Sequence, residues 1–273
     1  MEDRVALEIR DGVADVRLVR ADKMNALDDA MFAALISTAD RLKEEPGLRA
    51  VVISGEGRAF CAGLDMGNFA KMGSARPEPA SAPKSDAPGR LAARTNGISN
   101  RPQYAAWVWR ELPVPVIAAV HGVAFGGGFQ VMLGADLRYV APGTRMCVME
   151  MKWGLVPDMA GTQLMRHLAR EDVVRELTYT GRIFTAEEAL GLGFATRLCD
   201  DPRAAALETA REIATRNPDA VRAAKRILNQ APYVDAGTGL LSESREQDRL
   251  IGSANQIEAV KANLEKRAPD FRD

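Results

Sequence analysis

The first regular pattern in the chain is an alternation of apolar and polar side chains along residues 5–19, interrupted by Asp11-Gly12. Alternation predicts half-buried strands, and an Asp-Gly pair between two such strands is typical of a two-residue hairpin turn. Apolar runs rich in β-branched residues predict buried strands at 51–53 and 114–120. Shorter strands are expected at 136–140, 146–148 and 194–198.

Helical spacing of apolar residues accounts for much of the remaining chain. Asp28 is expected to cap a helix that runs to about Lys43. Thr185 and Glu188 have the spacing of a capping box, which opens a short helix, and apolar positions at 104–112 also have helical spacing. Beyond residue 201 the pattern predicts four helices, at about 202–215, 218–230, 237–251 and 254–267.

The periodicity is lost between about residues 66 and 97. The segment GSARPEPASAPKSDAPG within it is rich in Pro, Ala and Ser and holds no aromatic residue. Such a composition cannot bury enough apolar surface to offset the entropy lost when the chain becomes ordered. A mobile loop is therefore expected at about 70–97.

Glycine is concentrated where the strand at 114–120 ends. Gly122 and then Gly126-Gly127-Gly128 stand between this strand and the helix-like FQVMLGA. Glycines at a helix start let a ligand approach bare backbone N–H groups, and the helix dipole favours negative charge there. The turn is therefore expected to bind an anion, or a group that becomes anionic during a reaction. The alternative is that the glycines only permit close helix packing.

Two nucleotide-binding patterns are excluded at this turn. A Walker loop requires Lys followed by Ser or Thr after its last glycine, whereas Phe129 and Gln130 follow Gly128. A dinucleotide fingerprint requires G-x-G-x-x-G near the first strand and an acidic residue about 20 positions later. The glycine turn has neither this spacing nor this position.

A second junction of strand and loop lies at 50–65, where the strand leads into FCAGLD. Two such junctions can each supply one backbone N–H group to a single oxygen. The stretches FCAGLDM and HGVAFGGGF together resemble the two signatures of the crotonase superfamily, also called the enoyl-CoA hydratase/isomerase family. The resemblance extends, in the family's order, to KMNAL at 23–27, WGLVPDMAGTQ at 153–163 and GRIFTAEEALGLGF at 181–194.

The resemblance implies an α/β fold, a crotonase-like spiral of ββα units. The acyl-CoA site would lie in a core over residues 1–200, and residues 201–273 would form a C-terminal helical oligomerisation region. A homotrimer is expected, or a hexamer that is a dimer of trimers. The substrate would be an acyl-CoA thioester, and since coenzyme A is part of that substrate, no separate cofactor is expected. The loop at about 70–97 follows the FCAGLD stretch and would cover the acyl end of the site.

The resemblance also assigns roles to backbone groups. Removing a proton next to a thioester carbonyl, or adding water across its α,β double bond, places negative charge on the carbonyl oxygen. By position, the backbone N–H groups of Leu64 and Gly127 would form the oxyanion hole that stabilises this charge. A side chain at 127 would block the approach of the substrate. The residues expected at the coenzyme A side of the site are Lys23, Ala62 and Asp65.

Two positions distinguish hydration from other chemistry. In hydratases of this family, one catalytic glutamate stands two residues after the triple glycine and a second stands 20 residues later; these positions hold Gln130 and Glu150. An amide can hold water but cannot exchange protons near neutral pH, so Gln130 departs from the hydratase pattern. Glu150 lies among Met149, Met151 and Trp153, and burial there would raise its pKa to the range that a general acid or base requires.

Asp158 is the second candidate carboxylate, eight residues after Glu150 and in a Pro-Asp turn. The dienoyl-CoA isomerase branch of the family has an essential aspartate at this offset, although that branch also has an aspartate at the position of Gln130. The alternative role for Asp158 is to cap the helix that follows. Two carboxylates that face different carbons of an acyl chain suit double-bond isomerisation, which needs no bound water.

Three classes of function remain open. The first is an enzyme acting on enoyl-CoA, with isomerisation by Glu150 and Asp158 ahead of hydration by Glu150 with Gln130 holding water. The second is an acyl-CoA enzyme with other enolate chemistry, such as hydrolysis or decarboxylation. The third is a non-catalytic acyl-CoA binding protein that kept the oxyanion hole.

Composition limits the other possibilities. The 273 residues, 47% hydrophobic and 27% charged, can bury a substantial core, and the net charge of −1 favours neither a nucleic-acid binder nor a polybasic membrane protein. No transmembrane run is present. Three cysteines without a C-x-x-C pair, and no signal peptide, indicate a reducing cytoplasm. Two histidines are too few for a metal cluster, and Cys61 is expected to be a small buried residue rather than a nucleophile.

Overall fold

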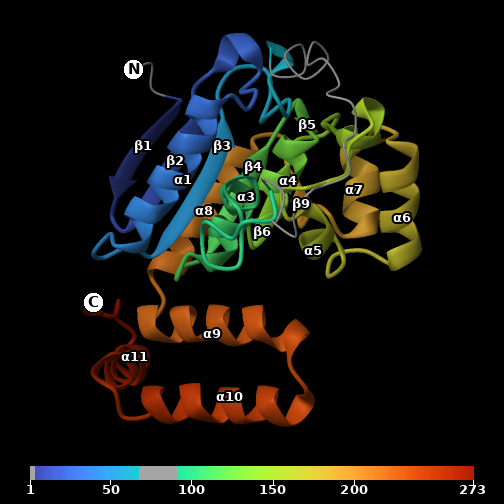
Figure 1. The fold of residues 1–273 in the computed structure, drawn as a ribbon. Helices are drawn as coiled ribbons and strands as arrows, with labels where there is room; N and C mark the ends of the chain where they lie inside the picture. Colours follow the sequence, from blue (N-terminus) through green and yellow to red (C-terminus); the bar gives the residue numbers. More distant parts are fainter. Residues whose placement is uncertain (1–3, 68–90) are drawn as a thin grey trace.

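The computed structural model describes residues 4–67 and 91–273 (Figure 1). Its main element is a six-stranded sheet with the order β1-β2-β3-β4-β6-β9, in which β1 is antiparallel to β2 and all other pairs are parallel. The strands are β1 Val5–Arg10, β2 Val13–Leu18, β3 Ala50–Gly55, β4 Val116–Val120, β6 Leu137–Val140 and β9 Arg197–Leu198. A smaller sheet has the order β5-β7-β8, formed by Val123–Phe125, Arg145–Cys147 and Phe184–Thr185.

The described part of the chain also contains ten α-helices and three 3-10 helices. The α-helices are α1 Asp29–Lys43, α3 Arg101–Glu111, α4 Gly127–Leu133, α5 Gly161–Met165, α6 Glu171–Thr180, α7 Ala186–Leu192, α8 Pro202–Ala214, α9 Pro218–Gln230, α10 Ala236–Leu250 and α11 Ala254–Glu265. The 3-10 helices are η1 Ala21–Lys23, η2 Met149–Trp153 and η3 Ala231–Tyr233.

Local signals in the sequence account for these elements well. The predicted hairpin is confirmed, because β1 pairs with β2 across Asp11 and Gly12, whose φ angles of 51° and 75° suit a two-residue turn. Asp28 caps α1 as predicted by accepting a hydrogen bond from the backbone N of Met31, 2.8 Å away. The predicted capping box of Thr185 also opens α7. The predicted strand at 194–198 is shorter, and only its last residues pair, as β9.

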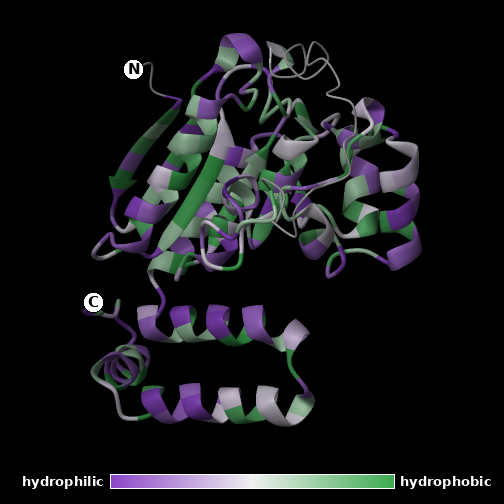
Figure 2. Cartoon of the chain, in the orientation of Figure 1, coloured by the Kyte–Doolittle hydropathy of each residue, from purple (hydrophilic) through white to green (hydrophobic). Residues whose placement is uncertain are grey.

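The large sheet is buried on both faces, which explains why its central strands are apolar along their length (Figure 2). On one face, α1, α3 and α4 cover side chains such as Val51 and Ile53 of β3. On the other face, α8 contributes Ala206 and Ala210, which pack against Val52 of β3 and its neighbours. Alternate residues of one strand thus belong to two separate hydrophobic clusters.

Most of the loop predicted at about 70–97 lies outside the described residues. Residues 91–97, which are described, form turns, and the backbone of Thr95 and Asn96 is hydrogen-bonded to Ser99. Ser99 and Asn100 are buried, and Asn100 begins α3 with a capping box to Gln103. The chain therefore returns to regular structure immediately after this segment.

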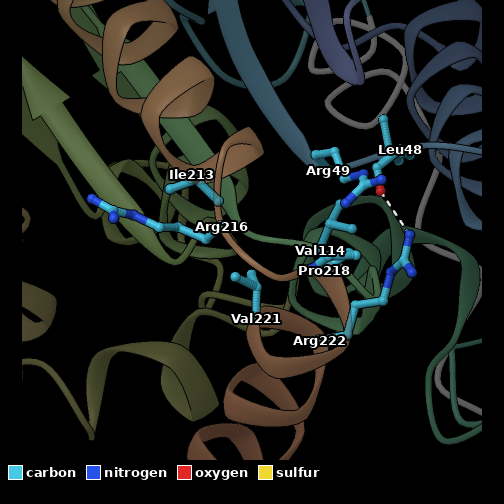
Figure 3. Close-up of a pocket in the computed structure, with 8 residues that line it drawn as sticks. All are labelled: Leu48, Arg49, Val114, Ile213, Arg216, Pro218, Val221 and Arg222. Atoms are coloured by element: carbon cyan, nitrogen blue, oxygen red, sulfur yellow. Dashed lines mark hydrogen bonds between the residues drawn. The ribbon is translucent and has the colours of Figure 1, made fainter. Parts of the chain in front are cut away.

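Helices α9 to α11 extend away from the sheets (Figure 1). Figure 3 shows the junction, where Leu48 and Val114 of the core face Arg222 of α9 around a small pocket, and the Arg222 guanidinium donates a hydrogen bond of 3.0 Å to the backbone oxygen of Leu48. Arg222 also contacts Asp273 at 3.0 Å, and Arg49 of the core contacts the other oxygen of the same carboxylate at 3.1 Å. The predicted domain division at residue 200 remains a prediction.

Lys225 of α9 forms the most buried of these contacts, with 6% of the residue exposed. Its Nζ atom donates to the backbone oxygens of Val114 (2.8 Å) and Trp109 (3.3 Å) and to Oδ2 of Asp136 (2.8 Å). Burial lowers the pKa of Lys225, and the Asp136 carboxylate opposes this shift. The ammonium group therefore fastens α9 to α3, to the segment before β4 and to the loop before β6.

Replacement of Lys225 by Met is expected to lower the free energy of unfolding by about 2–3 kcal/mol. The methionine fills the volume of the lysine stem but leaves the backbone oxygens of Val114 and Trp109 without this donor. The Asp136 carboxylate keeps its hydrogen bond from Val116 N but loses its positive partner. Urea unfolding at a fixed protein concentration measures the change. Lys261→Met, at an exposed position of α11, is the matched control and should change stability by less than about 0.5 kcal/mol. Equal effects of the two substitutions would contradict the role given to Lys225.

Candidate active site

The loop that contains the FCAGLD stretch is held between two other segments by backbone hydrogen bonds. On one side, Cys61 N donates to Val123 O and Cys61 O accepts from Phe125 N, both at 3.1 Å. On the other side, Leu27 N donates to Gly63 O at 2.7 Å, and Asp65 N donates to Leu27 O at 3.0 Å. The backbone of Leu64, between these bonds, is therefore fixed from both sides.

The two predicted oxyanion donors come from adjoining segments. Gly63 has a φ angle of +88°, and a Cβ atom there would lie 2.5 Å from Phe125 O and 3.6 Å from the backbone N of Gly127. Within the described residues, neither Leu64 N–H nor Gly127 N–H donates a hydrogen bond. Gly127 is the first residue of α4, so its N–H has no acceptor one turn earlier in the helix.

Glu150 lies in η2 with 9% of the residue exposed. Its Oε1 atom accepts a hydrogen bond of 2.6 Å from Nε2 of Gln130, whereas its Oε2 atom is buried and has no hydrogen-bond partner among the described residues. Burial raises the pKa of Glu150, the Gln130 amide lowers it, and the negative charge of Asp158 raises it further. The predicted rise in the pKa of Glu150 is confirmed in direction.

The side chain of Gln130 is 1% exposed and uses its oxygen fully. Oε1 accepts hydrogen bonds of 2.8 Å from the backbone N–H groups of both Met159 and Gly161. An amide oxygen has two lone pairs, and both are occupied here. The contacts of Gln130 with Met159 and Gly161 were not predicted, because backbone donors about 30 residues away leave no signal in the sequence.

Asp158 lies next to the segment that Gln130 holds and is exposed. Its carboxylate forms no ion pair or hydrogen bond with another residue within 4–67 and 91–273. Nearby protein atoms still shield the Asp158 carboxylate partly from water, and this desolvation raises the pKa of Asp158. The alternative role as a helix cap is wrong, because the residue before α5 is Ala160 in a left-handed conformation and no side chain caps that helix.

The triple glycine also makes room for Glu150. A Cβ atom at Gly126 would lie 3.2 Å from Oε1 of Glu150. At Gly127 a Cβ atom would lie 2.7 Å from Cδ1 of Leu27 and 2.8 Å from Sδ of Met159. The glycines therefore bring the start of α4 close to the carboxylate and to both neighbouring loops.

The residues predicted for the coenzyme A side lie on neighbouring segments. Lys23 is exposed at the end of η1, and Ala62 N donates to the backbone oxygen of Met24 at 2.9 Å. Asp65 is bound within the protein, since its carboxylate accepts from Arg20 at 2.6 Å and from the backbone N of Gly67 at 2.7 Å. These donors lower the pKa of Asp65. Its contact with coenzyme A remains a prediction.

Arg20 is a residue that the sequence did not single out. Its side chain contacts Asp65 and also donates to the backbone oxygen of Ala26 at 3.1 Å, and it lies 3.5 Å from Asp28. It thereby joins the segment around KMNAL to the loop that carries Leu64. An arginine after a strand is common on protein surfaces, so no local signal pairs it with an aspartate 45 residues later.

Cys61 is buried and its thiol donates to the backbone oxygen of Asn25 at 3.1 Å. Burial raises the pKa of the Cys61 thiol to about 12, so the predicted role as a buried filler rather than a nucleophile is supported. Residues 4–67 and 91–273 contain no cluster of His, Cys, Asp and Glu that could hold a metal ion. Across the same ranges, every helix is too short or too polar to span a membrane.

Comparisons with known proteins agree with this architecture. A family model described as enoyl-CoA hydratase/isomerase matches residues 8–273. The chain is 30% identical to methylglutaconyl-CoA hydratase of Mus musculus over 268 residues, which is 96% of this chain and 80% of that protein. It is 34% identical to the human Delta(3,5)-Delta(2,4)-dienoyl-CoA isomerase over 259 residues, or 93% and 77% of the two chains. The crystal structure of an enoyl-CoA hydratase from Bacillus anthracis superposes with a TM-score of 0.85, at 28% identity and 98% coverage of both chains.

Proposed function

The chain belongs to the enoyl-CoA hydratase/isomerase family, the crotonase superfamily, and we propose that it isomerises a carbon–carbon double bond in an enoyl-CoA thioester. Its fold is the crotonase-like α/β fold that the sequence predicted. The family alone does not choose the reaction, because both a hydratase and an isomerase are among the relatives. The choice of isomerisation depends on the residues around Glu150.

The observation that carries the proposal is the saturation of the Gln130 oxygen. Hydration requires a water that is held and deprotonated on one side of the double bond while a proton is delivered to the other. Gln130 cannot accept a hydrogen bond from such a water, because Oε1 already accepts from Met159 N and Gly161 N. Glu150 is the buried carboxylate that the Gln130 amide contacts, and a carboxylate acting alone suits proton removal and return without water.

In the proposed mechanism, Glu150 removes a proton from the acyl chain through Oε2. The N–H groups of Leu64 and Gly127 hold the thioester oxygen as negative charge develops on it. The double bond moves when a proton is returned to a carbon further along the chain, by Glu150 itself or by Asp158. The raised pKa of both carboxylates suits this exchange, because each can carry a proton closer to neutral pH than an ordinary carboxyl group.

Hydration is the second candidate function. The Gln130 amide nitrogen carries two hydrogens, and one of them is bonded to Glu150, so the other can donate to a water. This contact would hold the water without helping to deprotonate it, and Glu150 would act alone. A slow hydration of 2-enoyl-CoA is the outcome that this arrangement allows.

Assays with three substrates separate the two functions. The purified protein is expected to convert 3-enoyl-CoA and 3,5-dienoyl-CoA faster than it hydrates a short trans-2-enoyl-CoA. Asp158→Asn should lower the rate of isomerisation about tenfold. This loss is smaller than the usual effect of removing a general acid or base, because water can partly replace an exposed carboxylate. Fast hydration that is insensitive to Asp158→Asn would instead identify a hydratase. Other enolate chemistry would appear as a different product, and binding of CoA thioesters without turnover would indicate a binding protein.

The remaining features of the proposal concern partners. We propose a homotrimer, or a hexamer formed from two trimers, that acts on an acyl-CoA substrate in the cytoplasm without a separate cofactor. Helices α9 to α11 and the turn between α10 and α11 support the oligomer, because they carry several exposed large apolar side chains: Leu228, Leu240, Leu241, Ile251, Ile257, Val260 and Leu264. Sedimentation velocity of the purified chain tests the assembly.

A further inference from the structure

The amide group of Gln130 has only one orientation in which its hydrogen bonds are satisfied. Oε1 accepts from Met159 N and Gly161 N, both at 2.8 Å. If the amide were rotated by 180°, its NH₂ group would face these two donors, and its oxygen would face Oε1 of Glu150 across 2.6 Å. That orientation would bury opposed donors and opposed acceptors without hydrogen bonds, which is strongly unfavourable. The nitrogen therefore always points to Glu150.

The backbone around Gln130 is shaped for this contact. A Cβ atom at Gly161 would lie 2.6 Å from Oε1 of Gln130 and 2.8 Å from its Cδ, so any other residue would push the amide away from the backbone donors. Gln130 lies in the first turn of α4, and its backbone N–H donates to Gly126 O at 3.0 Å. The backbone of Gln130 is thus bonded to Gly126, and its amide group packs against Gly161.

A fixed donor at Gln130 makes the two oxygens of Glu150 unequal. Oε1 must accept the hydrogen bond from Gln130. In a protonated carboxyl group, the oxygen without the proton is the better acceptor. Oε2 is buried and has no partner within the described residues. When Glu150 takes up a proton, the proton is therefore placed on Oε2, the oxygen left free for the substrate.

We propose that Gln130 is a positioning residue that holds Oε1 of Glu150 as a permanent acceptor and so reserves Oε2 for the transferred proton. The same amide also binds the backbone N–H groups of Met159 and Gly161, which follow Asp158 in the chain. It thereby fixes the position of Asp158 relative to Glu150. This inference rests on the proposed function only for the identity of the substrate. The assignment of the proton to Oε2 is a property of the protein without ligand.

The other titratable groups that face Glu150 do not supply an alternative donor. Asp158 acts on Glu150 through its negative charge alone. The Cys147 thiol of β7 donates to Gly181 O at 3.0 Å, and burial, together with the charge of Glu150, raises its pKa to about 11. Gln130 is the side chain that donates to Glu150 among the described residues.

Nuclear magnetic resonance of the intact protein tests the inference without any turnover. Samples carry ¹⁵N in glutamine side chains and ¹³C in glutamate carboxyl groups, and Gln130→Met and Glu150→Gln identify the signals that belong to each residue. One Nε2 proton of Gln130 is expected far downfield, and it should stay there while the Glu150 carboxyl signal titrates. Movement of that proton to the position of a free amide when Glu150 is protonated would overturn the inference, because the proton would then lie on Oε1.

Two substitutions give the expected shifts in the midpoint of the Glu150 titration. Gln130→Met removes the hydrogen bond that favours the charged form, so the midpoint should rise by about 0.5–1 pH unit. Gln130→Glu keeps an oxygen for Met159 N and Gly161 N but sets its second oxygen against Glu150, so the two carboxyls should share one proton and titrate in two steps. An unchanged midpoint in a folded Gln130→Met protein would contradict the positioning role.

The kinetic counterpart distinguishes positioning from a merely structural role. In Gln130→Met the acid limb of the pH profile of kcat/KM should move upward by the same amount as the Glu150 midpoint, with KM for the thioester nearly unchanged. A uniform loss at every pH without such a shift would indicate only a damaged fold. If the parent shows no isomerisation while the magnetic resonance results hold, the proposed function fails and the positioning role stands.

Discussion

Glu150→Gln is expected to lower kcat for isomerisation by about 10³-fold while acyl-CoA binding is retained. A glutamine has the same shape and can still accept the hydrogen bond from Gln130, but it cannot take up or return a proton. General acid–base groups typically contribute about 10²–10⁴ to a rate, and Glu150 is the buried carboxylate of the site. Stopped-flow or steady-state assays with 3-enoyl-CoA measure the loss, and titration of the thioester measures binding.

The pH dependence of the parent provides a second readout of the same prediction. Glu150 must be unprotonated to remove a proton, and its pKa is raised above the ordinary value of 4.5 by burial and by the charge of Asp158. The rate should therefore rise with pH through a midpoint above 4.5, and the residual rate of Glu150→Gln should lack this limb. Glu208→Gln on the exposed side of α8 is the matched control and should retain the parent's rate and profile. Parent-level isomerisation by Glu150→Gln would refute the mechanism.

Gly63→Ala is expected to lower kcat by about 10²–10³-fold, the usual effect of losing one oxyanion donor. The added methyl group would lie 2.5 Å from the backbone oxygen of Phe125, and the φ angle of +88° is strained for alanine. Relief of this clash must move the loop away from β5, and the N–H of Leu64 moves with it, away from Gly127. The loss should appear mainly in kcat, because the thioester oxygen is most negative in the transition state.

Gly143→Ala separates backbone strain from the loss of the oxyanion donor. Gly143 has a φ angle of +74°, close to that of Gly63, but an added Cβ atom there would meet nothing within 4 Å. The control should lose about 1 kcal/mol of stability, or less, and should keep its kcat. Thermal melting and activity of both variants make the comparison. Equal activities in folded Gly63→Ala and the parent would show that the N–H of Leu64 is not needed for the reaction.

The site could be predicted in part because its residue types follow from short segments. The two glycine-bearing loops identify the family, and the family gives positions to Leu64, Gly127 and Glu150. The structure brings the two loops together and buries Glu150, but it also engages Gln130 and Asp65 in contacts that no short segment indicates. The catalytic roles of these residues remain predictions.

Elements whose signals are local could be predicted from the sequence without the fold. The Asp11-Gly12 turn, the cap at Asp28 and the four C-terminal helices depend on hydrogen bonds and apolar spacing within a few residues, so the pattern of the chain is enough to place them. Family membership also followed from motifs within short stretches, since glycine is required wherever backbones approach closely.

The hydrogen bonds between distant residues follow from the folded chain and not from local sequence. Gln130 meets backbone donors 29 and 31 residues away, Arg20 meets Asp65 45 residues away, and Lys225 meets Asp136 89 residues away. These partners are set by the path of the chain through parallel crossovers, which places segments side by side without any local trace in the sequence. The sequence therefore gives the candidate groups of this site, and the folded chain decides which of their atoms are free to react.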